Sequence, residues 1–385
     1  MQYRKFGKTG EQVSALGFGM MRLPLLDKNP EHIDEEKARN IVRYAIDQGV
    51  NYIDTAYPYH GASSETGGRS EPFTGRVLQG GYRRKVKLAT KLPSWLIEKE
   101  ADFDRYLNEQ LERLQTDYID FYLIHTLDRR HWPQVKEAGL FKFMERALSS
   151  GRVKHLGFSF HDEFSLFKEI VDAYDWEFCQ IQYNYLDERY QAGRAGLEYA
   201  AARGLGVVVM EPLRGGALVD GLVPAARELF RRAHPWKTEA AWGLEWVLNH
   251  PEVSVVLSGM SELEHVQENI TVASRTEAGS MKPEHLEVIE QVRKILESGN
   301  KIRCTSCGYC MPCPNGVNIP ENFKLYNVAF ALNRLETSRS NYGLLSGEQQ
   351  AGYCVECGSC EPRCPQNIPI IESLKEVHRT LNGQA

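Results

Sequence analysis

Short apolar segments alternate with amphipathic segments over residues 1–275, and this alternation narrows the choice of fold more than any other feature. The apolar segments are continuous rather than alternating in polarity, which is typical of parallel strands covered by helices. Eight such strands are predicted, at residues 16–21, 51–56, 86–91, 121–126, 155–160, 178–184, 206–211 and 254–259.

The segments between these strands predict helices. In residues 35–48, apolar side chains recur at helical spacing and Gly49 follows as a stop signal. Further helices are expected at residues 102–114, 134–149, 164–174, 194–202, 239–249 and 262–272. Eight strands that alternate with helical segments favour an α/β fold, the closed (β/α)8 TIM barrel. A doubly wound sheet is the alternative, but no GxGxxG turn follows the first strand. A hairpin around residues 7–10 is expected to close the bottom of the barrel.

The composition excludes several classes of protein. Hydrophobic residues make up 42% of the 385 residues, which excludes a disordered chain. A net charge of −5 argues against a general nucleic-acid binder. No apolar run approaches the roughly 18 residues of a membrane helix, and the start of the chain lacks the apolar stretch of a secretory signal. We therefore expect a cytoplasmic protein with neither a membrane nor a nucleic-acid partner.

Eight of the nine cysteines lie in two runs near the end of the chain. The first run has the spacing C-x2-C-x2-C-x2-C-P, and the second has C-x2-C-x2-C-x3-C-P. In such pairs of runs, three cysteines bind one 4Fe-4S cluster and the fourth, next to the proline, binds the other cluster. The predicted ligand sets are Cys304, Cys307, Cys310 and Cys364 for one cluster, and Cys354, Cys357, Cys360 and Cys313 for the second.

Two structural zinc sites are the alternative, but zinc ribbons use pairs of C-x2-C rather than triplets that end in Cys-Pro. The runs resemble those of dicluster ferredoxins, and the helical pattern of residues 320–336 indicates a small α-helical ferredoxin-like domain. The predicted organisation is a barrel at residues 1–282, a connecting helix at 283–299 and an iron–sulfur domain at 300–385. Cys179 lies outside the runs and is expected to be buried and inert.

Four side chains of complementary chemistry stand where the second, third and fourth predicted strands end. Asp54 and Tyr59 follow the second strand, and Lys91 and His125 end the next two. The chemistry of such a barrel takes place at this end of its strands. A phenol ionises near pKa ~10, and a neighbouring ammonium lowers that value. We therefore expect Lys91, held by Asp54, to make Tyr59 a general acid, and His125 to hydrogen-bond a substrate oxygen.

These four residues belong to the motifs DTAYPY (54–59), ATK (89–91) and LIH (123–125), through which residues 1–275 resemble the aldo/keto reductase family. The resemblance implies that a small carbonyl compound and its alcohol are interconverted with NAD(P)H. It also implies that Tyr59 is the proton donor, that Asp54 and Lys91 tune it, and that His125 orients the carbonyl. With the cysteine runs, the chain resembles the subgroup fused to a C-terminal dicluster 4Fe-4S ferredoxin-like domain.

The same resemblance implies which residues hold the nicotinamide cofactor. Ser159 in GFSF and Gln180 in CQIQYN are expected at the carboxamide, and Met210 stands where many members have a ring-stacking Tyr. The loop that follows Met210 is expected to lie at the pyrophosphate of the cofactor, where Arg214 would pair with the negative charge. The segment 258–269 is expected to bind the adenosine end of the cofactor. Gly259 and His265 occupy the places of basic residues that often bind the 2′-phosphate of NADPH, so the resemblance does not decide between NADH and NADPH as the cofactor. The full set is Ser159, Gln180, Met210, Pro212, Leu213, Arg214, Gly215, Glu268 and Asn269.

The two halves of the chain handle electrons differently, because hydride transfer moves two at once and clusters move one at a time. The clusters are therefore structural, or they exchange electrons with a redox partner such as ferredoxin; the sequence does not choose. The leading hypothesis is an iron–sulfur-containing aldo/keto reductase. The alternative is a ferredoxin-linked electron-transfer protein whose barrel binds a substrate or a flavin.

Overall fold

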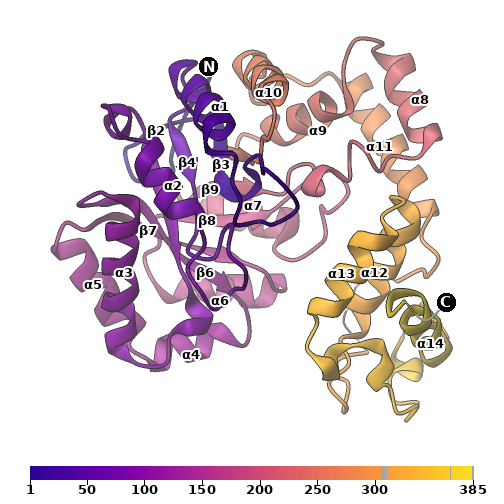
Figure 1. Ribbon diagram of the computed structural model, residues 1–385. Coiled ribbons are helices and arrows are strands. Elements are labelled where there is room, and N and C mark those ends of the chain that lie inside the picture. Colours follow the sequence, from indigo (N-terminus) through magenta and orange to yellow (C-terminus); the bar gives the residue numbers. More distant parts are fainter. Residues whose placement is uncertain (305–307, 309, 365, 384–385) are drawn as a thin grey trace. The chain divides into compact units, whose positions relative to one another are not determined.

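The computed structural model describes residues 1–304, 308, 310–364 and 366–383 (Figure 1). The chain divides into two compact units. The barrel unit comprises Met1–Gly215 and Ala240–Lys282. The C-terminal unit comprises Gly216–Glu239 and Pro283–Ala385. The segment Gly216–Glu239, although it lies between two barrel strands in sequence, therefore packs with the C-terminal unit.

Eight parallel strands form a closed barrel in the order β10-β3-β4-β5-β6-β7-β8-β9 within the described residues. The register between β10 and β3, in which Leu257 pairs with Gly17, closes the ring. All eight predicted strands and the (β/α)8 fold class are confirmed. The strands are β3 Leu16–Gly19, β4 Tyr52–Asp54, β5 Lys87–Leu92, β6 Ile119–Leu127, β7 Val153–Phe160, β8 Phe178–Gln182, β9 Gly206–Met210 and β10 Val255–Ser258.

An antiparallel hairpin of β1 (Tyr3–Lys5) and β2 (Gln12–Ser14) precedes the barrel. Phe6, at its turn, is fully buried among the aromatic side chains at the N-terminal ends of the strands. Its ring centroid lies 4.5 Å from that of Phe121 and 5.3 Å from that of Phe178. The hairpin therefore closes the bottom of the barrel, as expected.

The predicted helices of the barrel unit are present with small changes in their bounds. The exception is the helix expected at 134–149, which is two helices, α4 (His131–Glu137) and α5 (Leu140–Ser149). Gly139 separates them because its φ of +101° is not helical. The other helices are α1 Glu35–Asp47, α3 Glu100–Leu114, α6 Phe164–Ala173, α7 Gly193–Ala202, α9 Glu239–Leu248 and α10 Leu263–Arg275.

Two helices between predicted strands were not expected from the sequence. The first, α2 (Ser70–Val77), contains Gly75 and buries polar side chains, so it has no clear apolar periodicity. The second, α8 (Pro224–Ala233), belongs to the C-terminal unit and packs on α11 (Pro283–Ser298). A short 3-10 helix, η1 (Met20–Arg22), also replaces the end of the first predicted strand.

The rest of the C-terminal unit is helical, as expected, and its helices are α12 (Ile319–Ala331), α13 (Leu335–Leu344) and α14 (Ile370–Leu381). Their apolar faces form one core that includes Phe323, Tyr342 and Val377. Asn327 of α12 exchanges two hydrogen bonds with the backbone of Ile302, just before the first cysteine run. Asn322 accepts one from the backbone of Ala351, just before the second run. One helix thus anchors both cysteine segments. None of the helices in the described residues combines the length and hydropathy needed to span a membrane.

Candidate active site and cysteine pockets

The four predicted catalytic side chains come together at the C-terminal ends of adjacent strands. Asp54 ends β4, Lys91 lies in β5, His125 lies in β6, and Tyr59 follows β4 in a loop. Because β4, β5 and β6 pair in parallel, their C-terminal ends face the same side of the barrel.

Lys91 is the centre of this group and its side chain is completely buried. Its Nζ donates to Asp54 Oδ1 at 2.6 Å, to the Thr55 carbonyl at 2.8 Å and to the Tyr59 hydroxyl at 3.3 Å. Burial lowers the pKa of Lys91, but Asp54 and Tyr59 oppose it and leave the pKa above the ordinary value. The amine is therefore an ammonium that has all three hydrogens bonded.

Burial also governs the phenol of Tyr59. Burial raises its pKa above the ordinary value of 10.0, and the ammonium of Lys91 opposes this effect without reversing it. The expectation that Lys91 makes Tyr59 more acidic than a free phenol is therefore wrong in its net direction. The physical reason is that desolvation of the phenolate outweighs one nearby charge. The resting form of Tyr59 is a neutral O–H group, which is the form that can donate a proton.

His125 is buried beside Tyr59, with 6.1 Å between the ring centroids, and 5.2 Å from the ring of Trp95. Burial, together with the charges of Lys91 and His161, holds the pKa of His125 well below 6.5. The imidazole is therefore neutral at physiological pH and donates through only one of its nitrogens. Its Nδ1 has no hydrogen-bond partner among the described residues.

A buried polar network lies behind Lys91, and the sequence interpretation did not find it. Glu71 of α2 is fully buried and pairs with Arg113 at 2.9 Å. The same carboxylate accepts hydrogen bonds from Thr90 at 2.6 Å and from Gln110 at 2.7 Å. Gln110 also donates to the Lys91 carbonyl at 3.0 Å. The network ties α2 and α3 to the strand that carries Lys91. The sequence gives no clear signal for this network, because the helix that carries Glu71 lacks a clear apolar periodicity.

The residues expected at the nicotinamide lie on the next three strands of the barrel. Ser159, Gln180 and Met210 belong to β7, β8 and β9, and the Gln180 amide lies 3.4 Å from the Met210 sulfur. Ser159 Oγ accepts a hydrogen bond of 2.8 Å from the backbone of Thr126. Gln180 Oε1 is buried with no partner in the described residues. A ligand with an N–H donor, such as a carboxamide, fits this oxygen.

The remaining predicted cofactor residues are spread over two segments. Pro212, Leu213, Arg214 and Gly215 follow β9. The Arg214 guanidinium lies 3.2 Å from the Asp187 carboxylate, and both side chains are largely buried. Its charge is therefore already paired within the protein. Glu268 and Asn269 lie on α10, and Asn269 is held by a 3.0 Å hydrogen bond to Ser258.

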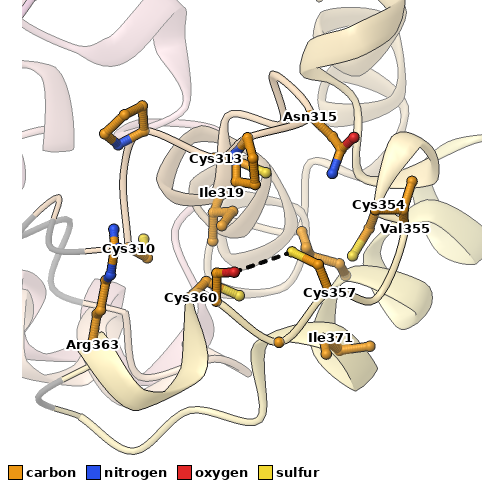
Figure 2. A pocket seen from close by; sticks show the side chains of 15 residues that line it. Cys310, Cys313, Asn315, Ile319, Cys354, Val355, Cys357, Cys360, Arg363 and Ile371 are labelled. Atoms are coloured by element: carbon orange, nitrogen blue, oxygen red, sulfur yellow. Dashed lines mark hydrogen bonds between the residues drawn. The ribbon is translucent and has the colours of Figure 1, made fainter.

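The cysteines of the C-terminal unit that the structure describes line two pockets. Cys304, Cys310 and Cys364 line one, and the other is lined by Cys310, Cys313, Cys354, Cys357 and Cys360. Figure 2 shows the second pocket, with Cys310 on the side of Arg363. Cys364 thus lines the same pocket as Cys304 of the first run, and Cys313 lines the same pocket as the cysteines Cys354, Cys357 and Cys360 of the second run. Cys307 lies outside the described residues.

The thiols surround their pockets rather than meeting at a point. In the described parts of the chain, no three Cys, His, Asp or Glu side chains are placed to hold one metal ion. Hydrogen bonding with the backbone of Ser359, and between Cys357 Sγ and Ser359 Oγ at 3.6 Å, lowers the pKa of Cys357, which favours the thiolate form that binds metals (Figure 2). Cys179, by contrast, is fully buried in β8, and burial raises its pKa, so it is an inert thiol as expected.

Known proteins match both parts of the chain. The model of the aldo/keto reductase family matches residues 15–282, and that of the 4Fe-4S dicluster domain matches residues 303–369. The uncharacterized oxidoreductase YrpG of Bacillus subtilis is 30% identical over 307 residues, which cover 70% of this chain and 90% of that protein. The 6-dehydroglucose reductase of Novosphingobium aromaticivorans is 28% identical over 282 residues, 69% of this chain and 88% of the relative. A solved aldo-keto reductase from Bacillus halodurans, in its holo form, has a TM-score of 0.62 and 26% identity, covering 76% of this chain and 96% of its own.

Proposed function

The chain belongs to the aldo/keto reductase family and carries a C-terminal 4Fe-4S dicluster domain, and we propose that it interconverts a small carbonyl compound and the corresponding alcohol by NAD(P)-dependent hydride transfer. Tyr59 is the general acid for reduction and the general base for oxidation. The observation that carries this proposal is the buried chain of hydrogen bonds from Asp54 through Lys91 to Tyr59.

Each side chain of this group has one physical task. As negative charge develops on the substrate oxygen, the Tyr59 O–H transfers its proton to it. The ammonium of Lys91, 3.3 Å away, stabilises the phenolate that remains. Asp54 keeps the ammonium charged and in place despite its complete burial. The neutral His125, next to Tyr59, supplies an N–H to the same substrate oxygen and leaves the proton transfer to the phenol.

A bound nicotinamide cofactor supplies or accepts the hydride. Gln180, with its unpaired amide oxygen, and Ser159 would hold the carboxamide, and Met210 would pack against the ring. The loop 212–215 would lie at the pyrophosphate, and Glu268 and Asn269 at the adenine. A sugar-like carbonyl is the first substrate class to examine, because a relative is named for reduction of 6-dehydroglucose.

The C-terminal unit holds two 4Fe-4S clusters in this proposal. The pockets support the crossed ligand sets, in which Cys364 joins Cys304, Cys307 and Cys310, and Cys313 joins Cys354, Cys357 and Cys360. Cys357 and Val355 are exposed beside the second pocket, where a one-electron partner such as ferredoxin would reach a cluster. The clusters therefore connect the protein to one-electron carriers, whereas the barrel handles electron pairs.

The substitution Tyr59→Phe tests the acid–base role. It removes the proton donor and keeps the ring, so we expect kcat for carbonyl reduction to fall by about 10²–10⁴-fold. Binding of NAD(P)H, measured by quenching of protein fluorescence, should stay within about threefold of wild type. Tyr57→Phe is a matched control because the Tyr57 hydroxyl bonds Glu109 rather than Lys91. Undiminished turnover by Tyr59→Phe would refute the assignment, and absence of nucleotide binding to the wild type would favour the electron-transfer alternative.

A further inference from the structure

His60 follows the candidate proton donor Tyr59 directly in sequence, and the proposed mechanism does not use it. Its side chain is buried, with only 8% of the residue exposed. Its φ of +59° lies in the left-handed region, which favours glycine and, among residues with a side chain, asparagine, aspartate and histidine. Backbone strain of this kind gathers at functional sites, where the surrounding contacts must hold it.

Both nitrogens of the His60 imidazole meet the backbone of the segment between β3 and α1. Nδ1 lies 2.7 Å from the Pro30 carbonyl oxygen, and the Leu23 N–H donates to Nε2 at 3.3 Å. A carbonyl can only accept and a backbone N–H can only donate, so the ring proton is on Nδ1. Burial lowers the pKa of His60, and the carbonyls of Pro30 and Met20 oppose this effect without reversing it. The imidazole is therefore a neutral bridge between two stretches of backbone.

The backbone of Tyr59 is also held by the residues that lead into α2. The Ser70 N–H donates to the Tyr59 carbonyl at 3.1 Å, and the Arg69 N–H donates to the His60 carbonyl at 2.9 Å. Gly68 packs so closely here that a methyl group built on it would overlap the Tyr59 carbonyl oxygen. Hydrogen bonds thus fix the peptide between Tyr59 and His60 to this segment, and the imidazole ties it to a second one.

The position of Tyr59 matters because its contact with Lys91 is the weakest of the three hydrogen bonds that the ammonium makes. The Tyr59 hydroxyl lies 3.3 Å from Lys91 Nζ, whereas Asp54 Oδ1 lies at 2.6 Å and the Thr55 carbonyl at 2.8 Å. A small displacement of the Tyr59 segment would therefore break this bond first. Misplacement of a reacting group by about 1 Å can lower a rate by about 10²-fold.

We propose that His60 is a positioning residue for Tyr59: its imidazole ties the Tyr59 peptide to the segment between β3 and α1 and so keeps the phenol within reach of Lys91. The role rests on the acid–base function proposed above. The bond to the Pro30 carbonyl carries most of it, because 2.7 Å is short for such a bond and the 3.3 Å contact with Leu23 is long. His60 acts through Tyr59 and touches no reacting atom.

Two substitutions in the full-length protein separate the imidazole from the backbone conformation. His60→Gly and His60→Asn both suit a positive φ, but only asparagine keeps an N–H group at the place of Nδ1. With glyceraldehyde as the carbonyl probe, we expect kcat to fall by about 10- to 100-fold in His60→Gly and to stay within about threefold of wild type in His60→Asn. The Kd of NADH and NADPH, measured by calorimetry, should be unchanged in both. His32→Asn is the matched control, because His32 is an exposed histidine of the same segment and pairs with Asp27.

Hydrogen exchange follows the same contacts without a substrate. The Leu23 amide should exchange faster in both variants, since each lacks the acceptor Nε2. The Ser70 amide, which donates to the Tyr59 carbonyl, should exchange faster only in His60→Gly. Unchanged protection of β6 in all the proteins would show that the barrel is folded in each of them.

Several outcomes would overturn the role. Unchanged kcat in His60→Gly would show that Tyr59 keeps its place without the imidazole. Equal losses in His60→Gly and His60→Asn would show that the bond to Pro30 does not matter. A loss that appears as a higher Kd for the nucleotides would assign His60 to cofactor binding instead. A wild type that binds neither nucleotide refutes the proposed function itself, and unchanged exchange at Leu23 and Ser70 refutes the tie through His60 independently of that function.

Discussion

At the scale of single residues, burial decides the protonation states in the candidate active site. Burial and the charge of Lys91 act in the same direction on His125, and the pKa of its imidazole falls well below 6.5. They act in opposite directions on Tyr59, where burial prevails and raises the pKa of the phenol. The site therefore presents two neutral hydrogen-bond donors beside one buried ammonium. This combination suits proton donation to a developing alkoxide.

These directions predict the pH dependence of the reaction. A group whose pKa is raised stays protonated to higher pH, so reduction should persist to about pH 10 and decline only as Tyr59 ionises. Because His125 is already neutral, no ionisation of its imidazole should alter kcat/KM between about pH 6 and 8. Steady-state kinetics with wild type and His125→Asn check this expectation. The variant should change the magnitude of kcat/KM but not the shape of its pH dependence. A change in kcat/KM near pH 6.5 in the wild type that is absent from His125→Asn would contradict the neutral imidazole.

At the scale of secondary-structure elements, α2 and α3 hold the strand that carries Lys91 in place. Glu71 of α2 accepts hydrogen bonds from Thr90 of β5 and Gln110 of α3, and it pairs with Arg113. Burial raises the pKa of Glu71, and Arg113 opposes this and favours the carboxylate. The active site thus depends on an ion pair that lies behind it and faces no ligand.

Removal of the Glu71 carboxylate should destabilise the barrel unit strongly. Glu71→Ala leaves the partly buried Arg113 and the donors of Thr90 and Gln110 unpaired, so we expect a loss of about 3–5 kcal/mol in the free energy of unfolding. Glu71→Gln keeps a hydrogen-bond acceptor and should lose less. Urea unfolding followed by tryptophan fluorescence measures both, with Glu36→Ala on the exposed face of α1 as the control. Equal effects of Glu71→Ala and Glu36→Ala would show that the network contributes nothing.

At the scale of the whole molecule, the boundary between the units does not follow the chain. Residues 216–239 lie between β9 and α9 in sequence but belong to the C-terminal unit. Arg334 holds the start of this segment, through the Gly216 carbonyl at 3.4 Å and the Asp220 carboxylate at 3.6 Å. Helix α8, later in the segment, packs on α11. The loop 212–215 after β9 is therefore followed directly in sequence by residues that belong to the C-terminal unit.

Loss of the clusters should therefore destabilise residues 216–221, which are far from the cysteines in sequence. Metal binding contributes folding free energy to small metal-binding domains, so removal of iron should loosen the C-terminal unit. We expect residues 216–221 to exchange their amide hydrogens faster after treatment with oxygen and a chelator, while β6 stays protected. Hydrogen-exchange mass spectrometry, with iron content measured on the same samples, checks this. Unchanged exchange at 216–221 in iron-free protein would show that this segment is independent of the clusters.

The sequence alone was enough to predict the barrel and the convergence of Asp54, Tyr59, Lys91 and His125, and to identify the two cysteine runs. The reason is that strand and helix periods are local, and a closed parallel barrel brings successive strand ends to one rim. Helix α2 was not predicted because buried polar side chains interrupt its apolar stripe. Helix α8 was not predicted although it is amphipathic, and its apolar side packs within the C-terminal unit.

The tertiary structure alone decided how these groups behave. The direction of the Tyr59 pKa depends on how much water the fold removes from the phenol. The pairing of Arg214 with Asp187, and that of Glu71 with Arg113, depend on distances between residues that are far apart in sequence. Desolvation and contacts between distant residues exist only once the chain is folded, so the spacing of residues in the sequence could not predict them.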